Sequence, residues 1–260
     1  MNISIVMPTY NEEKRIGKTL EAYINFFNNI KKKDKLNYRI LIVINNTKDD
    51  TLGVIKKFQK NNPEIYYLDL VRGGKGYAVI EGFKEELKTK SKIIGFVDAD
   101  LATQPEAFYY LIKNIGRNDG AIANRYSNLS KITPKFNFRR LIVAKIFNLI
   151  VRLFLHIPFQ DTQCGAKIFT RNSIKEIVNN VKMSQWAFDV EVLYVLHKKR
   201  YKIAQLPTIW KEVEGGSIKL GKSSLQMLFS IIQLRIVKSP FNKLLKPIKP
   251  IRDLIWGMLK

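Results

Sequence analysis

The chain is poor in cysteine and histidine. Its single cysteine, Cys164, excludes an internal disulfide framework and is typical of a reducing compartment. The two histidines, His156 and His197, lie far apart in the sequence, which does not suggest a histidine-rich metal site. We also expect no signal peptide, because the apolar run 3–7 is short and acidic residues follow it at once.

Acidic residues are scarce relative to basic ones. The 260 residues include 45 lysines and arginines against 22 aspartates and glutamates, for a formal net charge of +23. Such an excess indicates a polyanionic partner, either nucleic acid or an anionic membrane surface, or else a lysine-rich host composition. The length and the 46% hydrophobic content allow one large domain with a substantial core and an appendage.

Long uninterrupted apolar runs are also absent. Segment 141–157 is strongly apolar, but Lys145, Asn148, Arg152 and His156 recur in it every three or four residues. A membrane span needs about 20 predominantly apolar residues, so we predict an amphipathic helix with a basic stripe instead. Packing against the core and facing a membrane are both compatible with this pattern.

The segment 217–260 is basic and amphipathic. Nine lysines and arginines stand against one acid, Asp253, with apolar residues and Trp256 between them. Apolar helices that carry tryptophan and lysine are typical of segments lying in a bilayer interface, where each basic residue contributes about 1 kcal/mol. We predict interfacial helices here. The alternative, a basic tail for RNA, usually comes with stacking aromatics or a recognised fold, so nucleic acid is not expected as a partner.

The first 125 residues alternate strand and helix patterns. Strands are predicted at 3–7, 40–44, 65–70, 93–97 and 120–124, and apolar helical stripes beginning at Ile16, Leu52, Ala78 and Phe108 lie between or after them. Asn11 is predicted to cap the first helix, and residues 73–76 are predicted as a glycine loop. Such alternation indicates an α/β domain over residues 1–216, with a doubly wound, mostly parallel sheet flanked by helices.

Two aspartates, Asp98 and Asp100, end the strand 93–97. Side chains two residues apart on an extended chain point the same way, here into the crevice where open α/β sheets bind ligands. Paired carboxylates beside a phosphate site hold a hard cation such as Mg²⁺ or Mn²⁺ on a diphosphate. Lys75, in the glycine loop, is a candidate second neutraliser of phosphate charge. An isolated Asp-x-Asp also occurs at ordinary turns, so the neighbouring motifs decide whether this pair marks a metal site.

Those motifs resemble family 2 glycosyltransferases of the GT-A fold, in particular the polyprenyl-phosphate sugar synthases of the dolichyl-phosphate β-glucosyltransferase type. Pro8-Thr9-Tyr10-Asn11-Glu12 is similar to the family's opening segment. The stretch 98–106 resembles its metal-binding segment, and 75–79 resembles its Gly-Lys-Gly-x-Ala-Val loop. Further similar segments follow in the family's order at 161–167, 186–191 and 207–210, so that the resemblance runs from about residue 3 to 235.

The resemblance implies a metal-dependent, inverting transfer of a sugar to dolichyl or polyprenyl phosphate. Glucose from UDP-glucose is the favoured donor group, and mannose from GDP-mannose is the alternative. The expected location is cytoplasmic and peripheral, on the cytosolic face of an anionic membrane, with no transmembrane helix. Two further hypotheses stay open: a glycosyltransferase whose acceptor lacks phosphate, and a non-enzymatic basic protein that binds membranes or RNA.

The resemblance also implies roles for individual residues. Expected catalytic residues are Asp100, Arg125, Arg139 and Asp189, and the expected metal ligands are Asp98 and Asp100. The nucleotide sugar is expected to contact Pro8, Tyr10, Glu12, Asn45, Lys75, Asp98 and Ala99, and the acceptor phosphate to contact Arg125, Arg139 and Arg140. A phosphate monoester has a second pKa near 6, so at neutral pH the acceptor needs arginines to hold it more than a base to activate it.

Some of these residues allow more than one role. Asp189 and Glu191 stand where related enzymes place a base or an acceptor-orienting carboxylate, but a structural cap or salt bridge fits them equally well. The family usually has aspartate where this chain has Asn45, although an amide can still donate and accept hydrogen bonds. Ala102 stands where mannose-transferring relatives often have glutamine, which favours glucose. Cys164 is interpreted as structural, because the chemistry needs no thiol.

Overall fold

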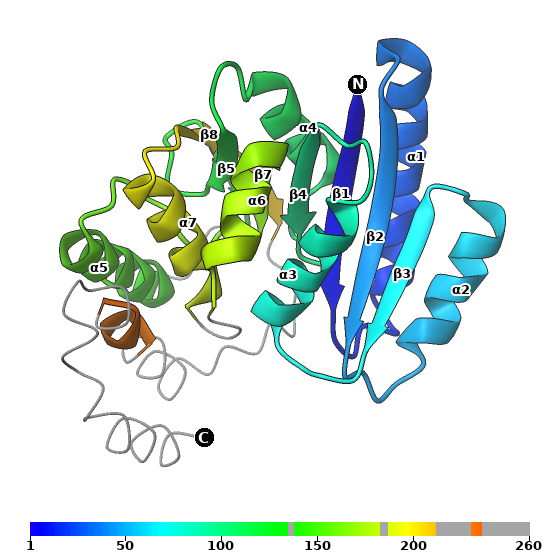
Figure 1. Ribbon diagram of the computed structural model, residues 1–260, viewed down its shortest axis with the longest axis horizontal. Coiled ribbons are helices and arrows are strands. Elements are labelled where there is room, and N and C mark those ends of the chain that lie inside the picture. Colours follow the sequence, from blue (N-terminus) through cyan, green and yellow to red (C-terminus); the bar gives the residue numbers. More distant parts are fainter. Residues whose placement is uncertain (135–137, 183–186, 212–229, 236–260) are drawn as a thin grey trace.

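A computed structural model describes residues 1–134, 138–182, 187–211 and 230–235 (Figure 1). The elements in chain order are β1 (Asn2–Thr9), α1 (Ile16–Asp34), β2 (Asn37–Asn45), α2 (Thr51–Asn61), β3 (Ile65–Leu70), α3 (Lys75–Glu86), β4 (Ile93–Val97), α4 (Pro105–Asn114), β5 (Gly120–Asn124), β6 (Lys131–Thr133), α5 (Phe138–Leu155), β7 (Ala166–Thr170), α6 (Arg171–Asn180), α7 (Phe188–Lys198), β8 (Ile203–Pro207) and β9 (Ile209–Lys211).

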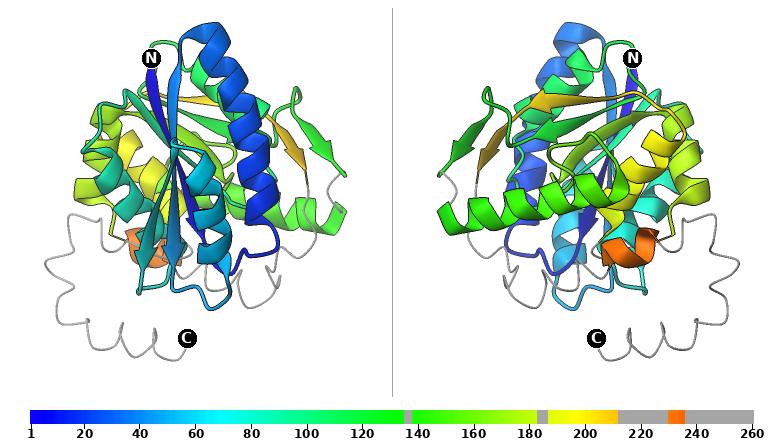
Figure 2. Two further views of the ribbon diagram at one scale, coloured as in Figure 1. Left: turned by 90° about the vertical axis from the view of Figure 1, so that its right-hand side faces the viewer. Right: turned by 90° about the vertical axis from the view of Figure 1, so that its left-hand side faces the viewer.

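Seven strands form one sheet in the order β3-β2-β1-β4-β7-β5-β8. All neighbours in it are parallel except β7, which runs antiparallel to both β4 and β5. The short strands β6 and β9 pair separately and lie to one side of the main sheet (Figure 2). The predicted mostly parallel α/β sheet is confirmed, and the insertion of β7 places residues from late in the chain beside β4.

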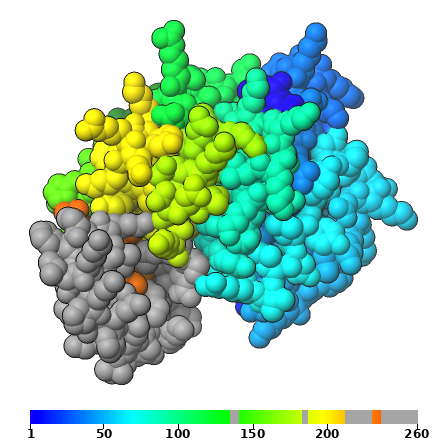
Figure 3. All heavy atoms as spheres, in the orientation of Figure 1, coloured from blue at the N-terminus to red at the C-terminus, as the bar shows by residue number. Residues whose placement is uncertain are grey.

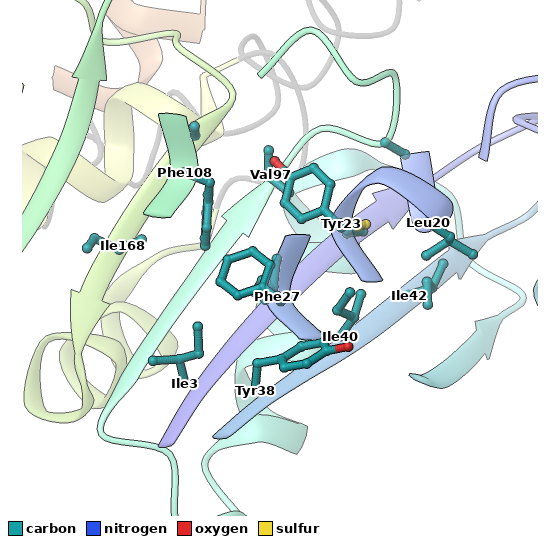
Figure 4. Close-up of a cluster of buried hydrophobic side chains, with 14 of the residues drawn as sticks. Ile3, Leu20, Tyr23, Phe27, Tyr38, Ile40, Ile42, Val97, Phe108 and Ile168 are labelled. Carbon is teal, nitrogen blue, oxygen red and sulfur yellow. The ribbon is translucent and has the colours of Figure 1, made fainter. Parts of the chain in front are cut away.

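Alternate side chains of the central strands enter two separate cores, as a pleated strand requires. Ile3, Ile5 and Met7 of β1 pack with α1, α2 and α4 on one face (Figure 4). Val6 packs with α3, α6 and α7 on the other face. The side chains of α3 and α6 meet on that face, as Figure 3 shows. Because both faces are covered, the ends of the strands are the places where the sheet is open to ligands.

Helix α5 has one buried and one exposed side. Val151 and Leu155 pack with α7 and with Ile231 and Leu234 of the described turn 230–235. The opposite side exposes Ile142, Val143, Ile146, Leu149, Ile150, Leu153 and Phe154 by 39–67%. Helix α5 therefore has a core-packing stripe and an exposed face that is itself apolar. Of the residues in the predicted basic stripe, Lys145, Arg152 and His156 are exposed, whereas Asn148 is buried. No helix among the described residues is both long and apolar enough to cross a membrane.

Two local predictions were wrong. Asn11 does not cap α1, because that helix begins at Ile16 and Arg15 stands at its N-cap. Asn11 instead adopts a left-handed conformation (φ 52°) and accepts a hydrogen bond from the Lys48 backbone. Helix α3 begins at Lys75 and not at Ala78, directly after Gly74 with φ 122°. Lys75 thus belongs to the first turn of a helix, where its position is more closely defined than in a loop.

Of the predicted tail 217–260, only the helical turn 230–235 is among the described residues. The interfacial helices expected in the remainder of that segment lie outside them.

Candidate active site

The two aspartates stand at the carboxyl end of β4, in the middle of the sheet. The turn that carries them is held against α1 by two hydrogen bonds. Thr19 Oγ1 donates to the Ala99 carbonyl at 2.6 Å, and the Tyr23 hydroxyl donates to the Thr103 carbonyl at 2.9 Å. Both donors are buried, so the turn rests on a rigid helix. Sequence reasoning did not identify Thr19 or Tyr23, because their roles depend on how α1 packs against this turn.

Asp98 and Asp100 are both partly exposed carboxylates. Burial, and secondly the charge of Asp98, raise the pKa of Asp100 above its usual value. The Ala102 backbone N–H donates to Asp100 Oδ1 at 2.9 Å, which orients that carboxylate. Because burial and the charge of Asp98 disfavour the ionised form of Asp100, a nearby cation would stabilise the two carboxylates.

A cationic side chain already lies at the first aspartate. The Lys75 ammonium is 2.6 Å from Asp98 Oδ1 and 3.7 Å from Asp189 Oδ2. Burial opposes its charge, but Asp189 and Asp98 outweigh that effect and raise the pKa of Lys75. The first turn of α3 thus delivers a permanent positive charge to the carboxyl end of β4.

Asp189 lies between two lysines, Lys75 and Lys167. Its Oδ1 accepts from Lys167 Nζ at 2.5 Å, and Lys167, which is fully buried, also donates to the Cys164 carbonyl at 2.7 Å. Burial raises the pKa of Asp189, but Lys167 and Lys75 lower it by more, so the carboxyl titrates below its usual range. The result is an alternating row of charges, Lys167–Asp189–Lys75–Asp98, built from β7, α7, α3 and β4.

Two glycines allow this row to form. A Cβ on Gly165 would overlap Asp98 Oδ2, and the Gly165 carbonyl accepts from the Asp98 backbone N–H at 3.1 Å. A Cβ on Gly76 would lie 2.7 Å from Cβ of Phe188, the residue next to Asp189. Any larger side chain at these positions would separate the charged groups.

A second charged group lies beyond β5. Arg125 follows that strand and pairs with Asp161 through Nε–Oδ2 (2.8 Å) and Nη2–Oδ1 (2.9 Å). The Arg125 guanidinium is also 5.7 Å from the ring of Trp210 in β9. Trp210 in turn bridges to Thr103, three residues after Asp100. The small sheet β6–β9 therefore links Arg125 to the aspartate turn.

The sequence of residues 4–178 matches that of glycosyl transferase family 2. The chain belongs to this family. It is similar to the dolichyl-phosphate beta-glucosyltransferase of Dictyostelium discoideum, with 34% identity over 243 residues that make up 90% of this chain and 73% of the relative. The Homo sapiens protein of the same name is 30% identical over 246 residues, which cover 90% of this chain and 75% of that one. The chain is thus a glycosyltransferase, as predicted.

Solved structures agree with the fold of this glycosyltransferase. One is glucosyl-3-phosphoglycerate synthase from Mycobacterium tuberculosis in complex with Mn²⁺, UDP-glucose and phosphoglyceric acid. It superposes with a TM-score of 0.68 at 16% identity, over 92% of this chain and 81% of that one. At this identity the similarity is evidence for the fold alone, and it confirms the predicted GT-A architecture.

Four of the residues expected to bind the donor, Pro8, Tyr10, Glu12 and Asn45, lie at or just after the ends of β1 and β2. Pro8 is buried beyond Val6, where the pairing of β1 with β4 ends, and Tyr10 is 51% exposed just after β1. Asn45 is buried, and its amide donates to the Thr9 carbonyl and accepts from the Gly74 N–H, so it joins β1 to the start of α3.

Glu12 is held in a different way. Both of its carboxylate oxygens accept from the Arg15 guanidinium at 2.6 Å, and its backbone N–H donates to Thr51 Oγ1. Burial raises the pKa of Glu12, and the Arg15 pairing opposes that rise. The loop after β1 is therefore fixed to the start of α2.

The remaining residues singled out in the sequence are two buried ones, Glu191 and Cys164, and three whose side chains are not described. Glu191 is buried and accepts from the Lys182 backbone N–H at 3.1 Å, so it joins α7 to the segment after α6. The side chains of Arg139 and Arg140 lie outside the described part of the glycosyltransferase, as does Trp186. Cys164 is buried, and burial together with Asp161 raises its pKa to about 11, as expected of a structural thiol.

Proposed function

We propose that this glycosyltransferase transfers glucose, with inversion, from UDP-glucose to dolichyl or a related polyprenyl phosphate. The observation that carries the proposal is the row of charges at the carboxyl end of β4, where Lys75 lies between the carboxylates of Asp98 and Asp189. That arrangement suits a diphosphate leaving group. The choice of glucose and of a lipid phosphate rests on the named relatives, which match over 90% of this chain.

A divalent cation, Mn²⁺ or Mg²⁺, fits the residues present. Asp98 and Asp100 would hold it, since both are partly exposed carboxylates at the carboxyl end of β4, and carboxylate oxygens are the ligands that such cations prefer. Within the described residues, no three His, Cys, Asp or Glu side chains group as a complete metal site. Two carboxylates combined with substrate phosphate oxygens are a usual way to bind such a cation. When bound, the ion would neutralise charge on the diphosphate.

Lys75 and the start of α3 serve the leaving group. As the bond between the anomeric carbon and the donor phosphate oxygen breaks, that oxygen keeps the electron pair and gains negative charge. The Lys75 ammonium, 38% exposed beside Asp98, can turn to that oxygen while Asp189 keeps it at the site. Electrostatic groups already in place before the reaction stabilise such charge without reorganisation.

The acceptor phosphate serves as the nucleophile. Its oxygen forms the new bond to the anomeric carbon on the face opposite the leaving diphosphate, so the configuration inverts. At neutral pH most of the phosphate is already dianionic, and no proton has to be removed. Arg125 would hold it. Asp189, which has a lowered pKa, accepts a hydrogen bond from Lys167 and forms an ion pair with Lys75, would position Lys75 and not act as the base.

Attachment to the cytosolic face of an anionic membrane would bring the lipid acceptor to the site. The support is the exposed face of α5, where Ile146, Leu149 and Leu153 are 50–67% exposed and Lys145 and Arg152 are exposed beside them. Apolar side chains flanked by basic ones are the composition of interfacial helices. The domain 1–216 would carry the chemistry, and the basic segment 217–260 would add to the attachment.

The test is a transfer assay with the full chain. The protein is incubated with dolichyl phosphate and Mn²⁺ or Mg²⁺, in one reaction with radiolabelled UDP-glucose and in a separate one with radiolabelled GDP-mannose. The lipid is then extracted. Metal-dependent label from UDP-glucose, lost in Asp100→Ala, is the expected result. Lipid label from GDP-mannose alone would mean that the donor is GDP-mannose and not UDP-glucose. Nucleotide-sugar binding without lipid label from either donor would contradict a phosphate acceptor, and RNA binding without nucleotide-sugar binding would contradict an enzyme.

A further inference from the structure

Asp161 holds Arg125 at three points. Besides the two guanidinium bonds, Asp161 Oδ2 accepts from the Arg125 backbone N–H at 3.0 Å. The Asp161 side chain is fully buried, and that of Arg125 is 15% exposed. Burial opposes the charge of Arg125, but Asp161 outweighs it and raises the arginine pKa well above its usual value. Both the plane and the direction of the guanidinium are therefore set by one carboxylate.

This pairing uses only one edge of the guanidinium. Nε and Nη2 face Asp161, whereas Nη1 has no hydrogen-bond partner in the part of the chain that the structure describes. A guanidinium offers five N–H donors in a fixed fork, so the Nη1 side and the second Nη2 hydrogen stay available for an anion. A planar fork held on one edge presents the other in a single orientation.

The rings of Trp210 and Tyr126 limit the remaining freedom of Arg125. They lie 5.7 and 5.9 Å from the guanidinium carbon, within cation–π range. The strand that carries Trp210 is bonded to the aspartate turn, since the Lys211 N–H donates to the Ala102 carbonyl at 2.8 Å. Arg125 is therefore held by a carboxylate on one edge and by elements that lead directly to Asp100.

Asp161 itself is placed by helix α5. The backbone N–H and the hydroxyl of its neighbour Thr162 both donate to Asn148 Oδ1, at 3.2 and 3.0 Å. Asn148 is buried in the middle of α5 and donates back to the Ala144 carbonyl. The side of α5 that carries Leu149 and Leu153 is exposed. The helix with the exposed apolar face is thus hydrogen-bonded to the residue next to the Arg125 partner.

We propose that Asp161 is a positioning residue for the acceptor phosphate. It holds Arg125 so that the free edge of the guanidinium receives the phosphate of the lipid, and Asn148 of α5 sets the position of Asp161. The proposal rests on the proposed function, because it needs Arg125 to contact the acceptor. It adds two residues, Asp161 and Asn148, whose effect reaches the substrate only through Arg125.

The test compares Asp161→Asn with Arg125→Gln and the double variant in the full chain, with detergent-dispersed dolichyl phosphate. Because Asn keeps the shape but removes the charge, the KM for dolichyl phosphate should rise about tenfold or more. The KM for UDP-glucose should change less than about twofold, since the donor end of the site is untouched. In the Arg125→Gln background, Asp161→Asn should add no further increase.

Glu86→Gln is the matched control. Glu86 is also a fully buried carboxylate paired with an arginine, Arg39, at 2.8 Å, but it lies at the opposite end of the sheet. We expect it to lower thermal stability while leaving the KM for dolichyl phosphate unchanged. If Asp161→Asn does not fold, Asn148→Ala replaces it and should raise the same KM several-fold, because it removes the support of Thr162.

The outcomes separate the two levels of the proposal. If Arg125→Gln raises the KM for dolichyl phosphate but folded Asp161→Asn and Asn148→Ala do not, the positioning role is wrong and the proposed function stands. If Asp161→Asn changes the KM values of both substrates equally, its role is merely structural. If Arg125→Gln leaves transfer to dolichyl phosphate unaltered, both the positioning role and the assignment of Arg125 to the acceptor are wrong.

Discussion

The Lys75 ammonium lies 2.6 Å from Oδ1 of Asp98, one of the two carboxylates that would hold a divalent cation. Lys75 and such an ion would therefore compete for the Asp98 carboxylate. Asp189, 3.7 Å from the same ammonium, offers Lys75 a second anion when Asp98 is taken by a metal. The leaving diphosphate would be a third anion for Lys75.

Replacing Lys75 should separate metal affinity from turnover. In Lys75→Met we expect Mn²⁺ to bind about three- to tenfold more tightly without nucleotide, because a partly exposed competing charge contributes about 1 kcal/mol. Glucose transfer should fall, since the leaving group loses a cation. Mn²⁺ titration followed by electron paramagnetic resonance measures the first effect. Lys84→Met, which breaks the exposed pair with Glu81, is the control. Weaker Mn²⁺ binding in Lys75→Met would refute the competition.

Gly165→Ala should disable the aspartate pair without unfolding the domain. The added Cβ would overlap Asp98 Oδ2, so the carboxylate must turn away from its place beside Lys75. We expect transfer to fall about a hundredfold, as when one electrostatic group of an active site is lost. Gly17→Ala is the control, because its Cβ would make only an ordinary 3.6 Å contact with Phe58. Wild-type Mn²⁺ affinity and turnover in Gly165→Ala would argue against this role.

The stability contributed by Asp189 should depend on pH in the acidic range. Burial opposes its charge, but the lysines lower its pKa in the folded state, so the stabilisation is complete above the unfolded pKa of about 3.9 and is lost below it. Asp189→Asn should therefore reduce the free energy of unfolding by about 3–5 kcal/mol at pH 7, because it leaves Lys167 buried without its carboxylate.

Urea unfolding of the wild type and of Asp189→Asn at several pH values measures this difference. We expect it to shrink as the pH falls below about 4. A difference that already shrinks between pH 7 and 6 would mean that the pKa of Asp189 is raised, as in a general base.

Cys164 should be unreactive in the folded protein. Its pKa is raised to about 11 by burial and by Asp161, and its side chain is fully buried. At pH 8 an aromatic disulfide reagent should label the native chain at least about a hundredfold more slowly than the chain in denaturant, because only the thiolate reacts. The absorbance of the released thiolate follows the reaction. Labelling at comparable rates would place Cys164 in an accessible site.

The exposed face of α5 should contribute to membrane binding. Ile146 and Leu153 are 52% and 67% exposed, so changing both to glutamate should leave the fold intact. We expect the affinity for anionic vesicles to fall at least about tenfold through lost apolar burial and added repulsion. Sedimentation with the vesicles measures it. Leu129→Glu, at an apolar residue that is 78% exposed and lies outside α5, is the control. Equal losses in both variants would contradict a specific role of α5.

Much of the fold is predictable because its signals are local. Apolar runs predict the strand Ile93–Val97 with the bounds it has in the structure, and the stripe from Ile16 to Phe27 predicts the buried face of α1. Helix starts are less predictable. Asn11 has the side chain of a good cap, but its segment is bonded to the loop after β2 instead. Contacts between distant segments overrode the local preference.

Spacing along the chain was enough to predict the α/β alternation, the aspartate pair at the end of β4 and the basic, apolar character of α5. The partners of the charged groups could not be predicted in this way: Lys167 with Asp189, Lys75 with Asp98, and Arg125 with Asp161. Those pairs depend on the three-dimensional strand order. Lys75 reaches Asp98 from the first turn of α3. The antiparallel insertion of β7 between β4 and β5 brings Lys167, and Asp161 from the segment before β7, to the same end of the sheet.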